Sequence, residues 1–582
     1  MIKIVHELWK NLKLKRRKQL FFLFILMLFN SFAELLTISA VIPFLTVLTF
    51  PDKIFNHENF QFFINYFELQ TSNEIIIPFI LIFILVTILS GFFRTVLLWK
   101  QIYLTQYIEA DINLKIFDNT LKEEMIVHKT RNSSDLISSI SQKTNAVIAS
   151  GIRPLMMLLS GFLTLLFVLT FLFILEPIMV LSIFAVFSLL YLIIIIVFKP
   201  VLKNNSKIIS KKNNKLIQSL MEGFGSIREI ILHNKQEFFT KNFHEADMSI
   251  RKSTAINQFI SSCPKLILEI VGIIILSTIA FIIFSQNGTI ISSIPMLGVL
   301  ALSAQRLLPI IQQMYFSFAA FYSGLALVED VVNLLNNDNL ISKKQQNIII
   351  NKINSINFNN VSFGYMSDKK CKFVFENLNF NIQESQLIGL VGKTGSGKTS
   401  LIDTIMYLLK PQEGNIEINK INIKKIDIAS YQNKISHVPQ NIYLTNDTIA
   451  ENIAFGINKD LIDVAKLNKA IKIAELSDFI KEIDKGIYAN VGENGQRLSG
   501  GQKQRLGIAR SVYRNFNILI LDEATSALDF ETEKKILMNI KINFPEKIII
   551  IISHREHSLK ICDKVFRIYN NTLFEDSINN LD

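Results

Sequence analysis

A glycine-rich segment at residues 392–399 has the spacing of a phosphate-binding loop. It reads GKTGSGKT and matches the pattern G-x-x-x-x-G-K-[ST]. In such loops backbone N–H groups hold phosphates, the lysine reaches the outer phosphates and the hydroxyl ligates Mg²⁺. Lys398 and Thr399 occupy these two positions. The predicted nucleotide contacts of this segment are Gly392, Lys393, Thr394, Gly395, Ser396, Gly397, Lys398, Thr399 and Ser400.

Two acidic residues further along the chain predict that the bound nucleotide is hydrolysed. The segment NILILDEATSALD at 517–529 has the pattern of a buried strand that ends in Asp522 and Glu523. We expect Asp522 to hold Mg²⁺ and Glu523 to activate the attacking water. Gln440 follows another strand pattern and would contact Mg²⁺ and water. His554 ends a third strand and would touch the γ-phosphate; a histidine there is often only a core residue, but the neighbouring motifs favour the catalytic interpretation.

Two further motifs complete the predicted nucleotide site. The segment LSGGQ at 498–502 opens a helix pattern, so its glycines and the helix dipole suit a γ-phosphate. The residues expected to make this contact are Ser499, Gly500, Gly501 and Gln502. Tyr365, in the segment VSFGY, is placed to stack on adenine.

The elements around the loop have the order that phosphate binding requires. Residues 386–392 have a buried-strand pattern and residues 400–409 have a helix pattern, so the loop joins a strand to a helix. Strand and helix patterns continue to alternate to the end of the sequence. We therefore predict an α/β P-loop ATPase domain at 351–582, preceded by a polar linker at 336–350.

The first 335 residues have a different character. Hydrophobic residues make up 50% of the whole chain, and an apolar helix of about 20 residues is enough to cross a bilayer. A run of such stretches argues against buried helices of a soluble protein. Six stretches meet the requirement, at approximately 20–50, 75–99, 155–175, 178–198, 266–284 and 294–327. The sequence thus predicts an α-helical membrane domain at 1–335 with six transmembrane helices and long cytosolic extensions.

The distribution of charge predicts the orientation of this domain. The net charge of +12 would also suit a nucleic-acid-binding protein, but the long loops 100–154 and 199–265 are rich in Lys and Arg, whereas the short loops 51–74, 176–177 and 285–293 contain few or no basic residues. Cytoplasmic loops of membrane proteins collect Lys and Arg. We therefore expect a multi-pass protein of the plasma (bacterial inner) membrane, with both termini in the cytosol and no nucleic acid partner. The three cysteines have no paired spacing, which suits a reducing compartment.

Three cations inside or next to the predicted spans are candidate substrate contacts. They are Arg94, Lys265 and Arg306. Charges within a bilayer are costly and are commonly functional, so these side chains could line a cavity for an anionic head group. The alternative is structural: Glu34 could pair with Arg306, Glu269 could pair with Lys265 one helical turn away, and Arg94 could extend to the membrane interface.

The second half of the chain resembles the ATPase domain of ATP-binding-cassette transporters. The resemblance rests on LSGGQ, directly upstream of LDEATSALD and about 100 residues after the phosphate loop. It extends over the whole chain, because six spans before one such domain are similar to a half-size exporter. The resemblance implies a transport ATPase that uses ATP and Mg²⁺. It also implies a homodimer, in which LSGGQ of one chain closes on ATP held by the other.

The membrane half looks like the lipid-linked oligosaccharide flippases of the PglK type. The similar segments are residues 32–49, 263–272 and 305–313, and the aromatic segment 51–67 matches an external helix of that family in position. The resemblance places Arg94, Lys265 and Arg306 at cationic positions that meet a pyrophosphate, although Lys265 stands where arginine is expected. The implied function is movement of a polyprenyl-pyrophosphate-linked glycan from the cytosolic to the outer leaflet of the lipid membrane.

Other functions are compatible with the same motifs. A lipid A exporter or a multidrug exporter would have this architecture. A channel or sensor of the same family is an alternative of another class, and it would more commonly have a regulatory insertion or degenerate catalytic residues. The helix turns near 130–135 and 222–228 are candidates for transmitting motion from ATP to the membrane half.

Overall fold

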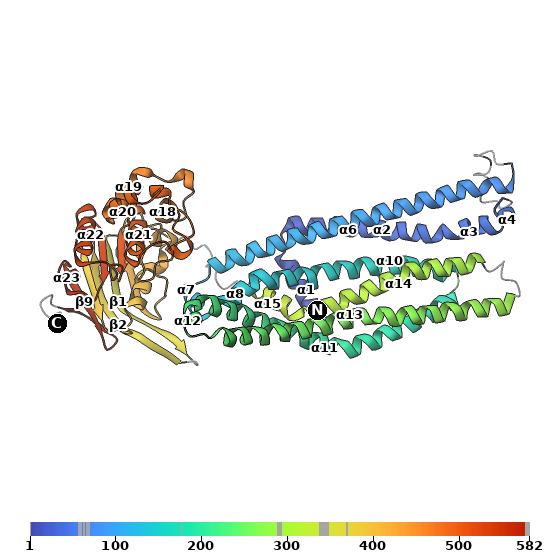
Figure 1. Cartoon of the computed structure of the whole chain (residues 1–582), viewed down its shortest axis with the longest axis horizontal. Helices are drawn as coiled ribbons and strands as arrows, with labels where there is room; N and C mark the ends of the chain where they lie inside the picture. Colours follow the sequence, from blue (N-terminus) through green and yellow to red (C-terminus); the bar gives the residue numbers. More distant parts are fainter. Residues whose placement is uncertain are drawn as a thin grey trace. The chain divides into compact units, whose positions relative to one another are not determined.

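The computed structural model describes residues 2–55, 61, 65, 70–175, 177–287, 294–336, 348–367 and 370–576. The chain divides into two compact units. The first comprises Met1–Glu123 and Val127–Ile341, and the second comprises Glu124–Ile126 and Ser342–Asp582. Within the described residues, the first unit is helical and the β-strands belong to the second unit (Figure 1).

Long helices that run along one another form the first unit (Figure 1). Its α-helices are α1 (Ile2–Asn11), α2 (Leu14–Ser39), α3 (Val41–Thr49), α4 (Pro51–Phe55), α6 (Ile76–Leu121), α7 (Met125–Thr130), α8 (Ser133–Ser138), α9 (Thr144–Ala146), α10 (Arg153–Leu175), α11 (Pro177–Gly225), α12 (Ile227–Leu232), α13 (Gln236–Asn287), α14 (Ile294–Ser323) and α15 (Leu325–Leu335). The other helical elements are the 3₁₀ helix η2 (Ser72–Ile75) and the π-helical stretches η3 (Ser139–Lys143) and η4 (Val147–Ile152).

Within the described residues, five helical stretches are long and apolar enough to cross a membrane. A sixth is obtained if the pair Leu307–Ser323 and Leu325–Leu335, bent by 58°, counts as one span. Several helices continue well beyond their apolar part. Helix α6, for example, has 46 residues, or about 69 Å at about 1.5 Å per residue. This length exceeds the roughly 30 Å of a hydrocarbon core, so the helix extends into water.

The breaks between helices follow the local sequence. Pro177 is the first residue of α11, where its missing N–H costs nothing and its fixed φ suits a helix. The predicted turns near 130–135 and 222–228 do lie between helices, since α7 ends at Thr130 and α11 ends at Gly225. Their role in transmission stays a prediction. Of the aromatic segment 51–67, α4 is described, and most of the remainder lies outside the described residues.

A polar contact joins three extensions of the first unit. The buried Lys143 places its Nζ 2.8 Å from Asp330 Oδ2, and Ser210 Oγ donates a hydrogen bond of 2.6 Å to the same oxygen. These residues belong to η3, α15 and α11, respectively. Because a buried ammonium needs a partner, this contact fixes how the three segments pack.

Two β-sheets and their covering helices form the second unit. The four-stranded sheet has the order β2-β1-β4-β5 and the six-stranded sheet has the order β10-β9-β3-β8-β7-β6. The strands are β1 (Ser355–Ser367), β2 (Lys370–Gln383), β3 (Leu387–Gly392), β4 (Glu413–Ile418), β5 (Ile421–Asn422), β6 (Ile435–Val438), β7 (Ile518–Asp522), β8 (Ile548–Ile552), β9 (Lys564–Tyr569) and β10 (Thr572–Asp576). The α-helices are α16 (Lys398–Ile405), α17 (Ile428–Gln432), α18 (Ile449–Ile453), α19 (Val464–Ile473), α20 (Ser477–Glu482), α21 (Gly500–Tyr513), α22 (Phe530–Asn543) and α23 (Glu556–Leu559).

The centre of the six-stranded sheet is parallel and almost entirely buried. Strand β3 pairs with β8, β8 with β7 and β7 with β6, all in parallel. Strand β8 consists of five isoleucines, all buried, and every residue of β7 is buried. Such runs are typical of strands covered on both faces. The predicted class, an α-helical membrane domain followed by an α/β P-loop domain, is confirmed.

Candidate nucleotide site and membrane cavity

The sheet brings the predicted catalytic residues to one edge. Parallel strands end at the same side, and the crevice outside their carboxyl ends is where open α/β sheets bind ligands. The phosphate loop follows β3, His554 follows β8, Asp522 ends β7 and Gln440 follows β6. These four strands are consecutive neighbours in the sheet. Residues separated by more than 160 positions in the chain therefore meet at one site.

The phosphate loop is built around residues that leave room for an anion. Gly397 caps α16 with φ of 97°, a conformation that favours glycine. The Ser396 Oγ is buried and makes no hydrogen bond to any residue within the described part of the chain. A phosphate oxygen would satisfy this hydroxyl, and the first turn of α16 supplies the N–H groups that bind anions. Ser396 and the first turn of α16 thus fit a phosphate group, and the other predicted contacts of the loop stay predictions.

Lys398 is buried at the start of α16. Its Nζ donates to the backbone carbonyls of Gly392 and Lys393 and lies 3.3 Å from His554 Nε2. Burial lowers the pKa of the Lys398 ammonium, while the carboxylates of Glu523 and Asp522 oppose this shift. A negatively charged phosphate in the loop would stabilise the charged form of this side chain.

Gly397→Ala is expected to abolish nucleotide binding and to destabilise the second unit. The added Cβ would lie 2.5 Å from Val374 Cγ1, in addition to the strain of a positive φ. The control is Gly456→Ala, where φ is +80° and no atom lies within 4 Å of the new Cβ, so only the backbone cost of about 1 kcal/mol remains. Nucleotide affinity and thermal unfolding of the two variants check the prediction. Equal effects in both would show that the contact with Val374 is unimportant.

Glu523 lies at the centre of the polar cluster. Gln440 Nε2 donates a hydrogen bond of 2.6 Å to Glu523 Oε2, and His554 Nε2 lies 3.5 Å from Glu523 Oε1. Glu523 adopts a φ of 47°, which is unusual for a residue other than glycine. Strained backbone of this kind is common where a side chain must point in a required direction. The geometry therefore suits a carboxylate that orients a water molecule.

Asp522 is the buried neighbour of Glu523. Burial raises the pKa of the Asp522 carboxyl to about 6, with a further contribution from the charges of Glu523 and Asp403, while Lys398 opposes the shift. A divalent cation would relieve this excess of negative charge. The predicted ligands Asp522, Thr399 and Gln440 offer oxygen atoms of the kinds that Mg²⁺ takes, with substrate phosphates supplying the rest. When bound, Mg²⁺ would neutralise charge on the transferred phosphate.

The LSGGQ segment forms the start of α21. Ser499 caps this helix by accepting a hydrogen bond from Gln502 N at 3.2 Å, and Gln502 Oε1 accepts one from Ser499 N at 2.8 Å. This reciprocal capping box fixes the entry of the chain into the helix. Gly500 and Gly501 follow as the first two helical residues, so the backbone here is accessible to a ligand.

Tyr365 lies in β1, near the phosphate loop. Its hydroxyl is 3.2 Å from Ser400 Oγ in α16, and its ring packs edge to face on Phe363 at 5.2 Å between centroids. The structure thus brings Tyr365 next to the residues that it was predicted to accompany. Adenine stacking by its ring stays a prediction.

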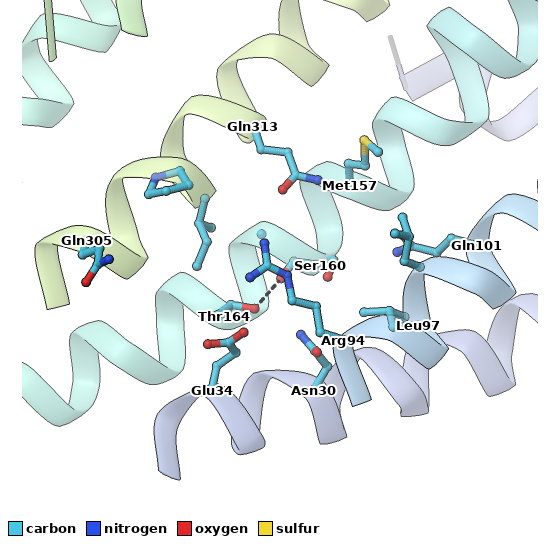
Figure 2. A pocket seen from close by; sticks show the side chains of 14 residues that line it. Asn30, Glu34, Arg94, Leu97, Gln101, Met157, Ser160, Thr164, Gln305 and Gln313 are labelled. Carbon is cyan, nitrogen blue, oxygen red and sulfur yellow. Dashed lines mark hydrogen bonds between the residues drawn. The ribbon is translucent and has the colours of Figure 1, made fainter. Parts of the chain in front are cut away.

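A polar cavity of about 400 Å³ lies among α2, α6, α10 and α14 (Figure 2). Arg94 lines it, and Figure 2 shows its guanidinium among the polar side chains of the group. The polar lining residues are Asn30, Glu34, Arg94, Gln101, Ser160, Thr164, Gln305 and Gln313. Such a set is unusual within helices that are otherwise apolar, because unpaired polar groups are costly in hydrocarbon.

The other two predicted cations are placed differently. Lys265 is on α13, away from the lining of this cavity, and its Nζ is 3.8 Å from Glu269. Both side chains of this pair are exposed in the single chain. The contact agrees with the structural interpretation of Lys265, in which it pairs with Glu269 one helical turn away. Arg306 follows Gln305 in α14. The structure describes its backbone but not its side chain.

The amide and hydroxyl groups of the cavity were missed by the sequence analysis. The sequence does contain an indication of them, because polar residues recur at helical spacing within the apolar stretches. Asn30 and Glu34 are four residues apart on α2, and Gln101 follows Arg94 by seven on α6. Both intervals place side chains on one face of a helix.

Comparison with known proteins identifies both halves of the chain. A family model described as "ABC transporter transmembrane region" matches residues 20–308, and one described as "ABC transporter" matches residues 375–526. A protein of Rickettsia typhi named as an export ATP-binding/permease protein is 28% identical over 506 residues, covering 84% of this chain and 84% of that protein. An ATP-dependent lipid A-core flippase of Paraburkholderia xenovorans is 25% identical over 477 residues, covering 80% and 77% of the two chains.

The fold is similar to that of a solved transporter. The structure of a bacterial Atm1-family ABC exporter with ATP bound aligns with a TM-score of 0.80 over 97% of this chain and 96% of that chain, at 19% identity. The two family matches, one to a transmembrane region and one to the ABC transporter model, show that the chain belongs to the ABC transporter family, as an exporter half-transporter whose ATPase activity is coupled to transport.

Proposed function

We propose that this ABC exporter flips a lipid with a phosphate- and sugar-bearing head group from the cytosolic to the outer leaflet of the bacterial inner membrane. The substrate that we favour is a polyprenyl-pyrophosphate-linked oligosaccharide. The cavity around Arg94 is the main support for this proposal. It combines the guanidinium of Arg94 with several amides and hydroxyls inside the membrane unit. A drug exporter would more commonly present an apolar cavity.

The polar groups of the cavity suit such a head group. Moving hydroxyls and charges into hydrocarbon without partners costs several kcal/mol for each group, so a path for the head group must replace the lost water. The guanidinium of Arg94 offers a forked set of donors to a phosphate. The Asn30 Oδ1 is buried and has no hydrogen-bond partner among the described residues, and it would accept from a sugar hydroxyl. Glu34 is 5% exposed and adds a second acceptor at the wall.

The energy for the movement would come from ATP bound between two copies of the chain. We propose a homodimer with both termini cytosolic, in which LSGGQ of one chain closes on the phosphate loop of the other. Shifting a two-state equilibrium from 1:99 to 99:1 takes about 5.5 kcal/mol of differential binding. Two sandwiched Mg²⁺–ATP molecules would supply this difference, and hydrolysis with Glu523 as the base would release it.

A lipid A precursor is the second candidate substrate. The relative from Paraburkholderia xenovorans is named as a lipid A-core flippase, and it matches most of this chain. Lipid A also combines phosphates with sugars, so its head group makes similar demands on the cavity. The two candidates differ in the tail, which is a polyprenyl chain in one and a set of acyl chains in the other.

Arg94→Ala is expected to reduce the amount of lipid moved for each ATP hydrolysed by about 10-fold or more, because a charge-assisted contact to phosphate is lost. Arg94→Lys should retain part of the transport, since the charge survives without the forked donors. Transport of labelled lipid and ATP hydrolysis are measured together in proteoliposomes. Lys265→Ala is the comparison variant, because Lys265 is a membrane-unit cation outside this cavity. An unchanged ratio in Arg94→Ala would contradict the head-group role.

A further inference from the structure

A buried carboxylate, that of Glu533, lies next to the proposed catalytic cluster. Glu533 lies in the first turn of α22, and its side chain is 0% exposed. An isolated buried carboxylate would be strongly destabilising, so its partners show what it holds in place.

The two oxygens of Glu533 together have partners in two different segments. Oε1 accepts from Thr525 Oγ1 at 2.8 Å and from Ser558 Oγ at 2.5 Å. Oε2 accepts from Arg555 Nη1 and lies 3.0 Å from His557 Nε2. Thr525 follows the catalytic Glu523 by two residues, whereas the other three partners follow His554. The carboxylate therefore links the segment after β7 to the segment after β8.

Arg555 strengthens the same link. Its Nη1 donates to the carbonyl of Leu528 at 3.0 Å, and its Nη2 donates to the carbonyl of Ser526 at 2.8 Å. A planar guanidinium has fixed donor directions, so contacts with Glu533 and two carbonyls restrict its position. His554 is the next residue along the chain, and its Nε2 is 3.5 Å from Glu523 Oε1. Fixing Arg555 therefore restricts the backbone that carries the histidine.

The segment 526–528 is held from a second side by α21, the helix that begins at LSGGQ. Gln504 Nε2 donates to Ser526 Oγ at 2.8 Å, and Gln504 Oε1 accepts from Ala527 N at 2.8 Å. The segments that follow β7 and β8 and the LSGGQ helix are thus joined in one hydrogen-bonded unit. Glu533 is the member of this unit that binds both loops.

The ionised state of Glu533 is favoured by these partners. Burial by itself would raise the pKa of this carboxyl, but the hydrogen bonds from Ser558, Thr525, His557 and Arg555 lower the pKa below its ordinary value. The charge is therefore retained at neutral pH and continues to attract Arg555.

We propose that Glu533 is a positioning residue for ATP hydrolysis, which aligns His554 with Glu523 by holding the segment 555–558 against the segment 525–528. The inference rests on the proposed catalytic roles of Glu523 and His554. A shift of about 1 Å in a catalytic group commonly costs up to about 100-fold in rate, whereas substrate binding is less affected. If Glu533 has this positioning role, its substitution should lower kcat and leave KM for ATP nearly unchanged.

The first test compares Glu533→Gln with Glu531→Gln in the full-length transporter in nanodiscs. Glu531 is in the same turn of α22 but is exposed, so it controls for the change of charge. We expect Glu533→Gln to lower kcat by about 10- to 100-fold with KM for ATP within about twofold, and Glu531→Gln to leave both unchanged. If Glu533→Gln does not fold, Arg555→Lys tests the same link, because lysine keeps the charge without reaching three partners. Parental kcat in the folded variant would overturn the inference.

The second test asks whether the effect passes through His554. If it does, the kcat of the double variant Glu533→Gln/His554→Ala should equal that of His554→Ala within about twofold, because coupled residues are not additive. Independent, multiplying losses would overturn the inference and indicate a general structural role. Parental kcat in His554→Ala would instead overturn the proposed role of His554 itself, so the two failures are distinguishable.

Discussion

Glu523→Gln is expected to lower ATP turnover by about 1,000-fold or more while ATP stays bound. The amide keeps the size of the side chain and can still contact Gln440, but it cannot take a proton from water. In the structure the carboxylate is held by Gln440 at 2.6 Å and by His554 at 3.5 Å, so its orientation is defined before the nucleotide arrives. The variant should accumulate as an ATP-bound closed dimer.

The measurement is phosphate release and retained ATP in detergent or nanodiscs, with Glu531→Gln as the matched control. The control has the same chemical change at an exposed position of α22. Turnover at the parental rate in Glu523→Gln would show that another group activates the water. Loss of ATP binding in this variant would show that the carboxylate supports the nucleotide site and not the chemical step.

Gly500→Asp is expected to lower ATP turnover by about 100-fold with little loss of folding stability. A Cβ at this position meets Ala527 Cβ at 3.6 Å, which is an ordinary separation. An acidic residue in the first turn of a helix is favourable for the fold. The same carboxylate would repel the γ-phosphate that LSGGQ is proposed to contact. Gly500→Ala is the control without the charge, and thermal unfolding together with ATP turnover separates stability from function.

The same variant tests whether the site is shared between two chains. Tagged chains with Lys398→Ala and Gly500→Asp are co-expressed, and the mixed dimer is purified. In the proposed arrangement, the phosphate loop of the second chain and LSGGQ of the first form one intact site, so hydrolysis should return. A purified mixed dimer without activity would contradict a site shared in this way.

The nucleotide-site geometry could be foreseen from local patterns because the centre of the six-stranded sheet is parallel. Gln440, Asp522 and His554 each follow an apolar strand, and parallel strands end at one edge. The structure brings them together for this reason. Glu533 was missed because it lies within a helix, where burial depends on what packs against that face. Its partners after β8 are adjacent in space and not in sequence.

The membrane cavity was less predictable for a related reason. Helices α2, α6, α10 and α14 are apolar on most sides, so the sequence does not indicate which faces meet. Arg94 was proposed from its position in a span, whereas the amides beside it become meaningful only after the helices pack. Lys265 shows the opposite case, since its contact with Glu269 follows from the four-residue spacing on α13.

We propose that ATP hydrolysis moves a lipid with an anionic, sugar-bearing head group across the membrane. The direct measurement uses proteoliposomes that contain a labelled polyprenyl-pyrophosphate oligosaccharide or labelled lipid A, and an impermeant reagent that detects the head group on one face. We expect movement that requires Mg²⁺–ATP, is absent in Glu523→Gln and is faster for the polyprenyl-linked glycan. Movement of lipid A alone would select the second candidate. If the protein moves neither lipid and apolar compounds stimulate its ATPase activity, the proposed lipid-flipping function is wrong.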